Sequence, residues 1–217
     1  MTTGVYQDPE AGATVYHFPL ALKSEGVTIL DTWRTLGMRG TGSHDIELKG
    51  VFVPDAAMQG VKRPAGAWHP FMHVVVLAAL PIFYGAYVGV IERAREIAFN
   101  MAARRKDDPL VALLVGELEN DVVAARIAHD SMVGLVSTHK PGPETSSAMI
   151  CRRTVLVNAL MRAANKAMEV GSGAGFYRSG ELERCFRDVQ GARYHPVAEK
   201  PQEQLTGRFL LGFEWGQ

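Results

Sequence analysis

The chain has 217 residues, and 47% of them are hydrophobic, which is enough to bury the core of one domain or slightly more. Lys plus Arg and Asp plus Glu both number 23, so the formal net charge is zero. This balance gives no basic footprint of the kind expected of a protein that binds nucleic acid or an anionic membrane surface.

Short motifs indicate neither secretion nor a metal site. The first ten residues, MTTGVYQDPE, lack the basic and apolar segments of a signal peptide, so we expect a cytoplasmic protein. Cys151 and Cys185 lie far apart without a CxxC motif, and we expect reduced thiols. His69 and His73 have the four-residue spacing of helical metal ligands, but no third ligand accompanies them, so we expect no metal.

The first quarter of the chain has the pattern of a small sheet. Residues 1–13 are polar and interrupted by Gly and Pro, which predicts a loose lead-in. Apolar and β-branched residues predict strands over 14–23, 27–30 and 45–53, the first of them demoted to an edge by Pro19. Strands in this order predict a short antiparallel meander.

The rest of the chain has the period of long helices. The helical period begins at His69, and Pro81 can serve as the first-turn proline of a helix that runs to about Arg104. Asp108-Pro109 has the acidic cap and proline that begin the next helix. Further helices are predicted over about 144–171 and 180–191.

One apolar run, Val74–Val90, approaches the length that crosses a membrane. Pro81, Gly85 and the flanking charges favour a buried core helix instead, so we expect no membrane partner. Gly85 and Gly89 lie four apart on one helix face and permit close contact between helices.

Together these elements predict an α+β fold that is mainly α. A short antiparallel β-meander, expected as a partial β-domain over residues 1–63, is followed by an up-and-down helical bundle over residues 64–217. Because so few strands cannot cover themselves, we expect a homo-oligomer, a dimer or tetramer built through the helices.

A first stretch carries a resemblance to a known family. Residues Trp33–Pro54, WRTLGMRGTGSHDIELKGVFVP, place a glycine loop before alternating strand residues, which on spacing alone indicates a loop between two strands. The string resembles the W-x-x-L-G-M-R-G-T/S motif in the middle β-domain of acyl-CoA dehydrogenase-like flavoproteins. Its RGTGSH form is similar to the branch of flavin-dependent two-component monooxygenases. His44 follows a flexible loop and could reach a ligand, but it is more simply a residue at the start of a strand.

A second stretch, GSGAGFYRSGELERCFRD, covers residues 171–188. Glycines at a helix end alone indicate a C-cap. Joined to ELERCFRD, they resemble the family's G-G-x-G-F/Y and E-R-x-x-R-D passage. For Arg187-Asp188 a structural ion pair is expected rather than a contact to a ligand. The resemblance implies that Gly173, Gly175 and Phe176 approach the FAD of a neighbouring subunit, since backbone without side chains can come close to a phosphate.

Arg105 is a further candidate cofactor ligand. It partly matches the family's R-x-x-F-G-x-P-L element, whose arginine meets the cofactor pyrophosphate across a subunit interface. The Phe-Gly pair is absent here, so a solvated basic helix end is an equal alternative.

The position of the base separates two enzyme classes. Many acyl-CoA dehydrogenases carry a glutamate shortly after the R-D pair, where this chain has Tyr194-His195-Pro196. The monooxygenase branch carries a histidine there, so the resemblance implies His195 as the catalytic acid/base. A histidine that only fixes the turn is the alternative. A dehydrogenase would need a carboxylate elsewhere, with Glu117 and Glu119 the first to consider.

We therefore predict a flavin-dependent oxidoreductase of the acyl-CoA dehydrogenase-like type that uses FAD or FMN. Monooxygenase activity is favoured over dehydrogenation of an acyl-CoA. Expected partners are a small-molecule or acyl-CoA substrate and a flavin reductase or separate N-terminal chain. The family's N-terminal helical domain has no counterpart in the sequence, so a non-catalytic or partial subunit is the third hypothesis.

Overall fold

The computed structural model describes residues 2–58 and 62–216, and these form two compact units. One unit contains the described residues up to Arg34 and those from Gly40 to His69. The other contains Thr35–Arg39 and Pro70–Trp215. The second unit is the larger and holds all five α-helices of the described residues.

The first unit is built from short antiparallel strands. One sheet has the order β1 (Thr2–Asp8), β2 (Gly12–Phe18) and β5 (Lys62–Pro64). A two-stranded sheet pairs β3 (Val27–Ile29) with β4 (Ile46–Leu48). Two short 3-10 segments complete the elements before the helices, η1 (Arg39–Thr41) and η2 (Asp55–Met58). The predicted antiparallel pairing across the glycine loop is confirmed, in shorter strands than expected.

The loose lead-in predicted for residues 1–13 is wrong. Residues 2–8 form β1, and a tight turn joins them to β2: the Asp8 carboxylate accepts the N–H groups of Glu10 and Ala11, both at 2.9 Å, and Gly12 has φ +73°. The prediction missed this hairpin because β1 buries little of its surface. Val5, for example, is 68% exposed, so the sequence lacks the apolar alternation of a half-buried strand.

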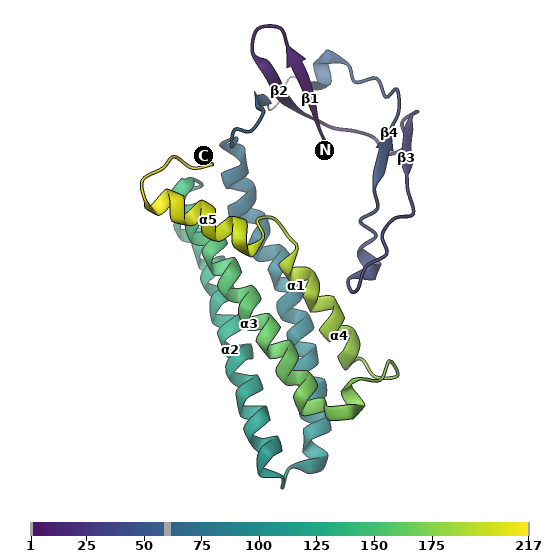
Figure 1. The fold of residues 1–217 in the computed structure, drawn as a ribbon, viewed down its shortest axis with the longest axis vertical. Helices are drawn as coiled ribbons and strands as arrows, with labels where there is room; N and C mark the ends of the chain where they lie inside the picture. Colours follow the sequence, from purple (N-terminus) through teal and green to yellow (C-terminus); the bar gives the residue numbers. More distant parts are fainter. Residues whose placement is uncertain (1, 59–61, 217) are drawn as a thin grey trace. The chain divides into compact units, whose positions relative to one another are not determined.

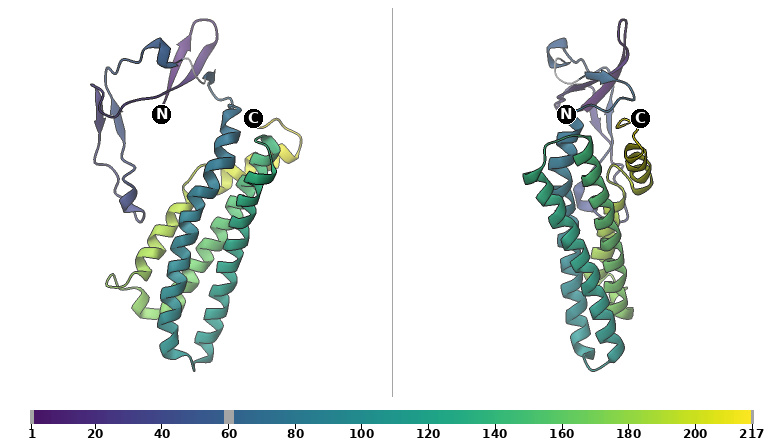
Figure 2. Two further views of the ribbon diagram at one scale, coloured as in Figure 1. Left: turned by 180° about the vertical axis from the view of Figure 1, so that it is seen from behind. Right: turned by 90° about the vertical axis from the view of Figure 1, so that its left-hand side faces the viewer.

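The second unit is an up-and-down bundle of three long helices, as predicted. They are α1 (Phe71–Ala102), α2 (Pro109–Thr138) and α3 (Pro143–Gly175), and Figures 1 and 2 show them side by side. Short connections join them, the first through η3 (Ala103–Arg105). Three shorter elements follow along the bundle: α4 (Leu182–Val189), η4 (Gln190–Arg193) and α5 (Glu199–Leu210).

Local signals explain where the long helices begin. Asp108 caps α2, since its side chain accepts the N–H of Leu110 at 2.9 Å and Pro109 occupies the first turn. Pro81 does not lie in a first turn, because α1 begins at Phe71 and continues through the proline. The Pro81 carbonyl accepts a hydrogen bond from His129 of α2 at 2.9 Å, which ties the two helices at this point.

Small side chains contribute to the packing of the helical unit. Ala94, Ala98 and Ala102 of α1 are buried, and α1 packs against α2, α3 and α4. Close contact holds at Gly85, where a Cβ would lie 3.3 Å from His129 Nε2, but at Gly89 a Cβ would meet nothing within 4 Å.

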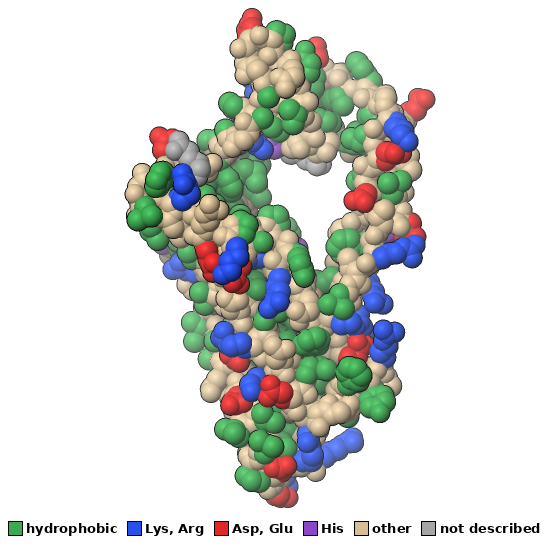
Figure 3. Space-filling view, in the orientation of Figure 1, with side chains coloured by type: hydrophobic (Ala, Val, Ile, Leu, Met, Phe, Trp, Pro, Cys, Tyr) green, Lys and Arg blue, Asp and Glu red, His purple; other side chains and the backbone are tan. Residues whose placement is uncertain are grey.

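The first long helix is unusually apolar. Within the described residues, Phe71–Arg105 is the one helical stretch that has the length and composition to cross a membrane. On the face in Figure 3, acidic and basic side chains of the bundle are interspersed with apolar ones. Arg162 and Asp121 of this bundle form an ion pair at 2.8 Å.

The segment Thr35–Arg39 belongs to the helical unit because it is seated on α4. Arg187 donates to the Leu36 carbonyl at 3.0 Å, and the Met38 N–H donates to Asp188 Oδ1 at 2.6 Å. Gly37 lies so close to α4 that a Cβ would be 2.1 Å from the Arg187 carbonyl oxygen. Only glycine can occupy this position without moving the segment.

Gly37→Ala should therefore displace the segment or destabilise the bundle by about 1–3 kcal/mol, the usual range for overpacking. Urea unfolding gives the stability, and hydrogen exchange of the Met38 amide reports whether the segment has lifted. Gly40→Ala is the matched control, because a Cβ there meets nothing within 4 Å. Equal stability and equal Met38 protection in the two variants would show that the close approach does not matter.

Candidate functional site

The candidate site lies at the turn that follows α4 and η4, where His195 is half-buried against α1. Phe83 stacks parallel to the imidazole, with ring centroids 6.0 Å apart and planes 11° apart. Tyr84 and Tyr87 meet the same ring edge-on at centroid distances of 5.9 Å and 5.5 Å. Three aromatic rings from one helix therefore exclude water from most of the histidine.

The polar contact of this imidazole is with Tyr87, whose hydroxyl lies 2.7 Å from Nε2. Burial lowers the pKa of His195 below its ordinary value, and the nearby Arg153 charge lowers it further. Burial raises the pKa of Tyr87 to about 12, with smaller contributions from Tyr84 and Asp188. Both groups of the pair are therefore uncharged near neutral pH.

Arg153 of α3 holds the turn that carries His195. Its guanidinium is buried, at 1% exposure, and Nη2 donates to the carbonyls of Ala192, Arg193 and His195 at 3.1, 3.2 and 3.0 Å. Its Nε donates to the Tyr84 hydroxyl at 2.6 Å, which in turn donates to the Ala192 carbonyl at 3.0 Å. No described carboxylate lies within ion-pair distance of this guanidinium, so backbone dipoles and a phenol solvate the charge.

The sequence contains a signal for this arginine that the prediction did not use. Met149, Leu156 and Leu160 are buried residues of α3, and Arg153 falls between them at helical spacing on the same face. A charged residue inside an apolar stripe must find hydrogen-bond partners. Tyr84 and Tyr87, three apart on α1, were likewise overlooked although that spacing places both rings on one face.

The segment Thr35–Arg39 reaches the same site. Gly191, in η4, has so little space that a Cβ would lie 2.8 Å from the Tyr87 hydroxyl and 3.2 Å from Met38 Cγ. Met38 has a positive φ of 52°, a conformation that its bond to Asp188 stabilises. The segment Thr35–Arg39, η4 and α1 therefore converge around the Tyr87–His195 pair.

The glycine stretch, residues 171–175, lies at the C-terminal end of α3, and the predicted helix end is confirmed there. Ser172 interrupts the helix with φ 51° and ψ −151°. Gly171 and Gly175 serve packing, since Cβ atoms there would lie 2.6 and 3.1 Å from Leu182 Cδ2. Gly173 faces open space, and Phe176 is 82% exposed.

Arg105 lies beside this stretch. Its Nη2 donates to the carbonyl of Val170 at 2.6 Å, one residue before the glycines begin. The structure thus brings together two residues that lie 65 positions apart in the sequence. Its role toward a cofactor, like those of Gly173, Gly175 and Phe176, stays a prediction.

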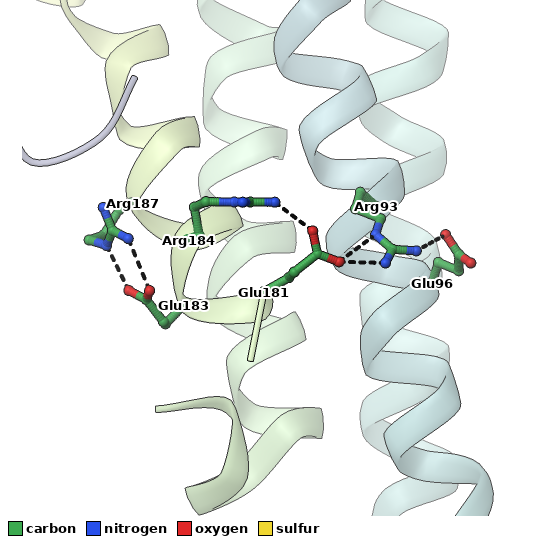
Figure 4. Close-up of polar contacts among 6 residues, drawn as sticks. All are labelled: Arg93, Glu96, Glu181, Glu183, Arg184 and Arg187. Carbon is green, nitrogen blue, oxygen red and sulfur yellow. Dashed lines mark hydrogen bonds and ion pairs between the residues drawn. The ribbon is translucent and has the colours of Figure 1, made fainter. Parts of the chain in front are cut away.

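Ion pairs fix the segment between the glycines and the histidine turn (Figure 4). Arg93 of α1 bridges Glu96 and Glu181, and Glu181 also binds Arg184. On the other side of α4, Glu183 binds the guanidinium of Arg187 through both carboxylate oxygens, at 2.6 and 2.9 Å.

The structural ion pair predicted between Arg187 and Asp188 is therefore wrong. Adjacent residues on a helix point in different directions, so each finds another partner. Arg187 pairs with Glu183, and Asp188 accepts the Met38 N–H.

The two alternative bases are both engaged in ion pairs between helices. Glu117 binds Lys166 at 2.8 Å. Glu119 binds Arg95 and, more weakly, Arg126. The hydrogen bond from Arg95 holds the pKa of the Glu119 carboxyl below its ordinary value, which is opposite to the shift that a carboxylate base requires.

The remaining histidine candidates have other surroundings. His44 Nδ1 accepts the backbone N–H groups of Thr32 and Trp33, both at 3.1 Å, so this ring fixes the local chain. His69 precedes the start of α1 and does not share a helix face with His73. Among the residues described, no three His, Cys, Asp or Glu side chains are grouped to hold a metal ion.

Comparison with known proteins places this chain among relatives of about twice its length. A "Putative acyl-CoA dehydrogenase YdbM" of Bacillus subtilis (strain 168) is 26% identical over 185 residues, which cover 79% of this chain and 46% of that protein. The "Flavin-dependent monooxygenase, oxygenase subunit HsaA" of Rhodococcus jostii (strain RHA1) is 26% identical over 229 residues, covering 92% and 59%. The chain thus spans about half the length of the curated relatives it matches.

Solved structures share the fold. A nitrososynthase from Micromonospora carbonacea var. africana superposes with a TM-score of 0.86 at 18% identity, over 97% of this chain and 56% of that one. XiaF from Streptomyces sp., in complex with FADH2 and glycerol, superposes with a TM-score of 0.75 at 19% identity, over 94% and 56%. Residues 75–200, more than half of the chain, match the family profile "Acyl-CoA dehydrogenase, C-terminal domain". The chain therefore belongs to the acyl-CoA dehydrogenase C-terminal domain family.

Proposed function

We propose that this chain forms part of a flavin-dependent monooxygenase in which His195 handles the proton at the reacting centre. The observation that carries this proposal is the uncharged His195–Tyr87 pair, enclosed by aromatic rings and held by Arg153. A neutral histidine in a water-poor site can donate to or accept from an oxygen atom near neutral pH. The similarity to the oxygenase subunit HsaA supports the same class of reaction.

Dehydrogenation of an acyl-CoA is the second candidate, and the carboxylates argue against it. That reaction needs a base whose pKa is raised by burial, able to remove a proton from carbon. Glu117 and Glu119 are ion-paired, and the shift at Glu119 is downward. The similarity to YdbM keeps this candidate open for experiment.

A flavin, FAD or FMN, fits the glycine stretch of this family member. A Cβ at Gly173 would meet nothing within 4 Å, and the guanidinium of Arg105 is bonded to the Val170 carbonyl, three residues earlier in the chain. In that arrangement the backbone and the positive charge would hold a phosphate or pyrophosphate, with Gly175 and Phe176 beside it. The reduced flavin would supply the two electrons that allow one atom of O2 to enter the substrate and the other to leave as water.

The proposed partners follow from the same class. An oxygenase subunit receives its reduced flavin from elsewhere, so we propose a flavin reductase as partner and a small molecule as substrate, in the cytoplasm. The electrons then come from the reductase, and this chain supplies the site. A separate chain that completes the domain arrangement of the family is an alternative partner.

The helical unit should also associate with further copies. Large apolar side chains that are half exposed or more occur on all three long helices: Ile82, Phe83, Leu110, Leu113, Ile127 and Val155. Where such side chains form a contiguous patch, a partner usually covers it. Light scattering at micromolar concentration should report a dimer or tetramer, and a clean monomer would contradict this proposal.

Flavin binding is the first test of function. We expect oxidised or reduced FAD or FMN to bind the chain, and we expect Gly173→Asp and Arg105→Gln each to weaken binding by about tenfold or more, because they add a negative charge or remove a positive one beside a phosphate. Titration followed by flavin fluorescence gives the affinities.

The matched control is Arg104→Gln, which removes an exposed charge from the neighbouring position. Gly173 is a better probe than Gly175, where any side chain would press on Leu182. If the unmodified chain binds neither flavin in either redox state, it is not an enzyme by itself, and the partial-subunit hypothesis is favoured.

The second test concerns His195. With a reductase and a panel of phenolic substrates, His195→Ala should lower oxygenation by about a hundredfold or more, the usual range for a residue that handles a proton. Flavin affinity should hardly change. His139→Ala, at an exposed histidine of the same bundle, should retain full activity. Reduction of the flavin by an acyl-CoA at a rate unaffected by His195→Ala would instead identify a dehydrogenase.

A further inference from the structure

The hydrogen bond between Tyr87 and His195 has one donor, and its surroundings decide which group that is. Tyr87 is 3% exposed, and among the described residues its hydroxyl makes no hydrogen bond other than the one to Nε2. Gly191 lies close to its oxygen, since a Cβ at that position would be only 2.8 Å away. A buried hydroxyl hydrogen needs an acceptor, and Nε2 is the one at hand. Tyr87 therefore donates and His195 accepts.

This direction fixes the position of the imidazole proton. A neutral histidine carries one N–H, and the hydrogen bond at one ring nitrogen decides where that hydrogen sits. With Nε2 accepting, the hydrogen is on Nδ1. The opposite arrangement would leave the hydrogen of the buried Tyr87 hydroxyl without an acceptor among the described residues. The lowered pKa of His195 and the raised pKa of Tyr87 keep both groups in the neutral forms that this requires.

We propose that Tyr87 is a positioning residue that holds His195 with its proton on Nδ1, so that the histidine presents a hydrogen-bond donor, not a basic lone pair, to the bound substrate. The matching substrate chemistry is an oxygen atom that carries or gains negative charge, such as that of a phenol. This part rests on the proposed function. The tautomer itself is a property of the chain without any ligand.

The charges that face the ring fit this role. Arg153 approaches from α3 without a carboxylate partner among the described residues, Tyr84 from α1 is a neutral phenol, and Asp188 of α4 is bonded to the Met38 N–H. On its own turn, Arg193 and Tyr194 are exposed side chains. The nearest buried charge is therefore positive, and it stabilises negative charge on an oxygen next to Nδ1.

The tautomer can be measured directly on the 217-residue chain. Nitrogen-15 NMR of histidine-labelled protein at about pH 8 distinguishes a protonated from an unprotonated ring nitrogen, and loss of signals in His195→Asn identifies the residue among the seven histidines. We expect protonated Nδ1 and unprotonated Nε2 in the unmodified protein. Protonated Nε2 at His195 in the unmodified protein would overturn the proposal.

Tyr87→Phe removes a single oxygen atom and should move the proton of His195 toward Nε2. Tyr84→Phe is the matched control, because its ring also meets His195 edge-on but its hydroxyl bonds to Arg153 and Ala192. The proposal fails if Tyr87→Phe keeps the original tautomer, or if Tyr84→Phe changes it equally.

In oxygenation assays, Tyr87→Phe should lower kcat by about tenfold or more with little change in KM, as expected for loss of proton control. The two hypotheses fail separately. A wrong tautomer in the ligand-free protein removes the role of Tyr87 and leaves the monooxygenase proposal standing. If the tautomer is as expected but the His195→Ala variant keeps full oxygenation activity, the proposed function of His195 is refuted instead.

Discussion

The structure around the candidate site depends on one buried guanidinium. A charge taken out of water costs several kcal/mol unless hydrogen bonds replace its hydration. Arg153 meets this cost with three carbonyl groups of the turn at residues 192–195 and with the phenol of Tyr84. Because the carbonyls come from η4 and the turn after it, the phenol from α1 and the guanidinium from α3, none of the three parts is fully satisfied without the others.

The short helix α4 connects this turn to the glycine stretch. It has eight residues, so its ends are about 12 Å apart. At its start, Leu182 fills the space that Gly171 and Gly175 leave open. At its end, Asp188 holds Met38, whose side chain approaches Gly191 beside Tyr87. A shift of α4 would therefore change both the proposed flavin contacts and the surroundings of His195.

Much of the helical unit could be predicted from the sequence, because its signals are local. Asp108-Pro109 begins α2, and the glycines after Val170 end the regular part of α3. The hairpin at residues 2–18 could not, since β1 is stabilised by pairing and by the Asp8 turn and not by an apolar face. Pro81 shows the same limit: contacts from other helices decide whether a proline begins a helix or lies within it.

The candidate site shows a similar division. His195 could be named from the sequence because it follows a recognisable motif. Its partners could not be named in that way, since Tyr87 and Arg153 are separated from it by 108 and 42 positions and join it only through packing. The one available signal, an arginine at a buried position of α3, indicates that partners exist without saying which groups they are.

The buried guanidinium also bears on which side chain can work at position 195. A positive charge close by stabilises the ionised form of a carboxylate and lowers its pKa, so a glutamate there would be a weak base. The same charge, together with burial, keeps a histidine neutral, as the lowered pKa of His195 indicates. A neutral imidazole can still donate a hydrogen bond, and its electrostatic environment favours negative charge on the oxygen that accepts it. Under the proposed function, these surroundings would therefore disfavour proton abstraction from carbon by a carboxylate at this position and favour chemistry at an oxygen atom.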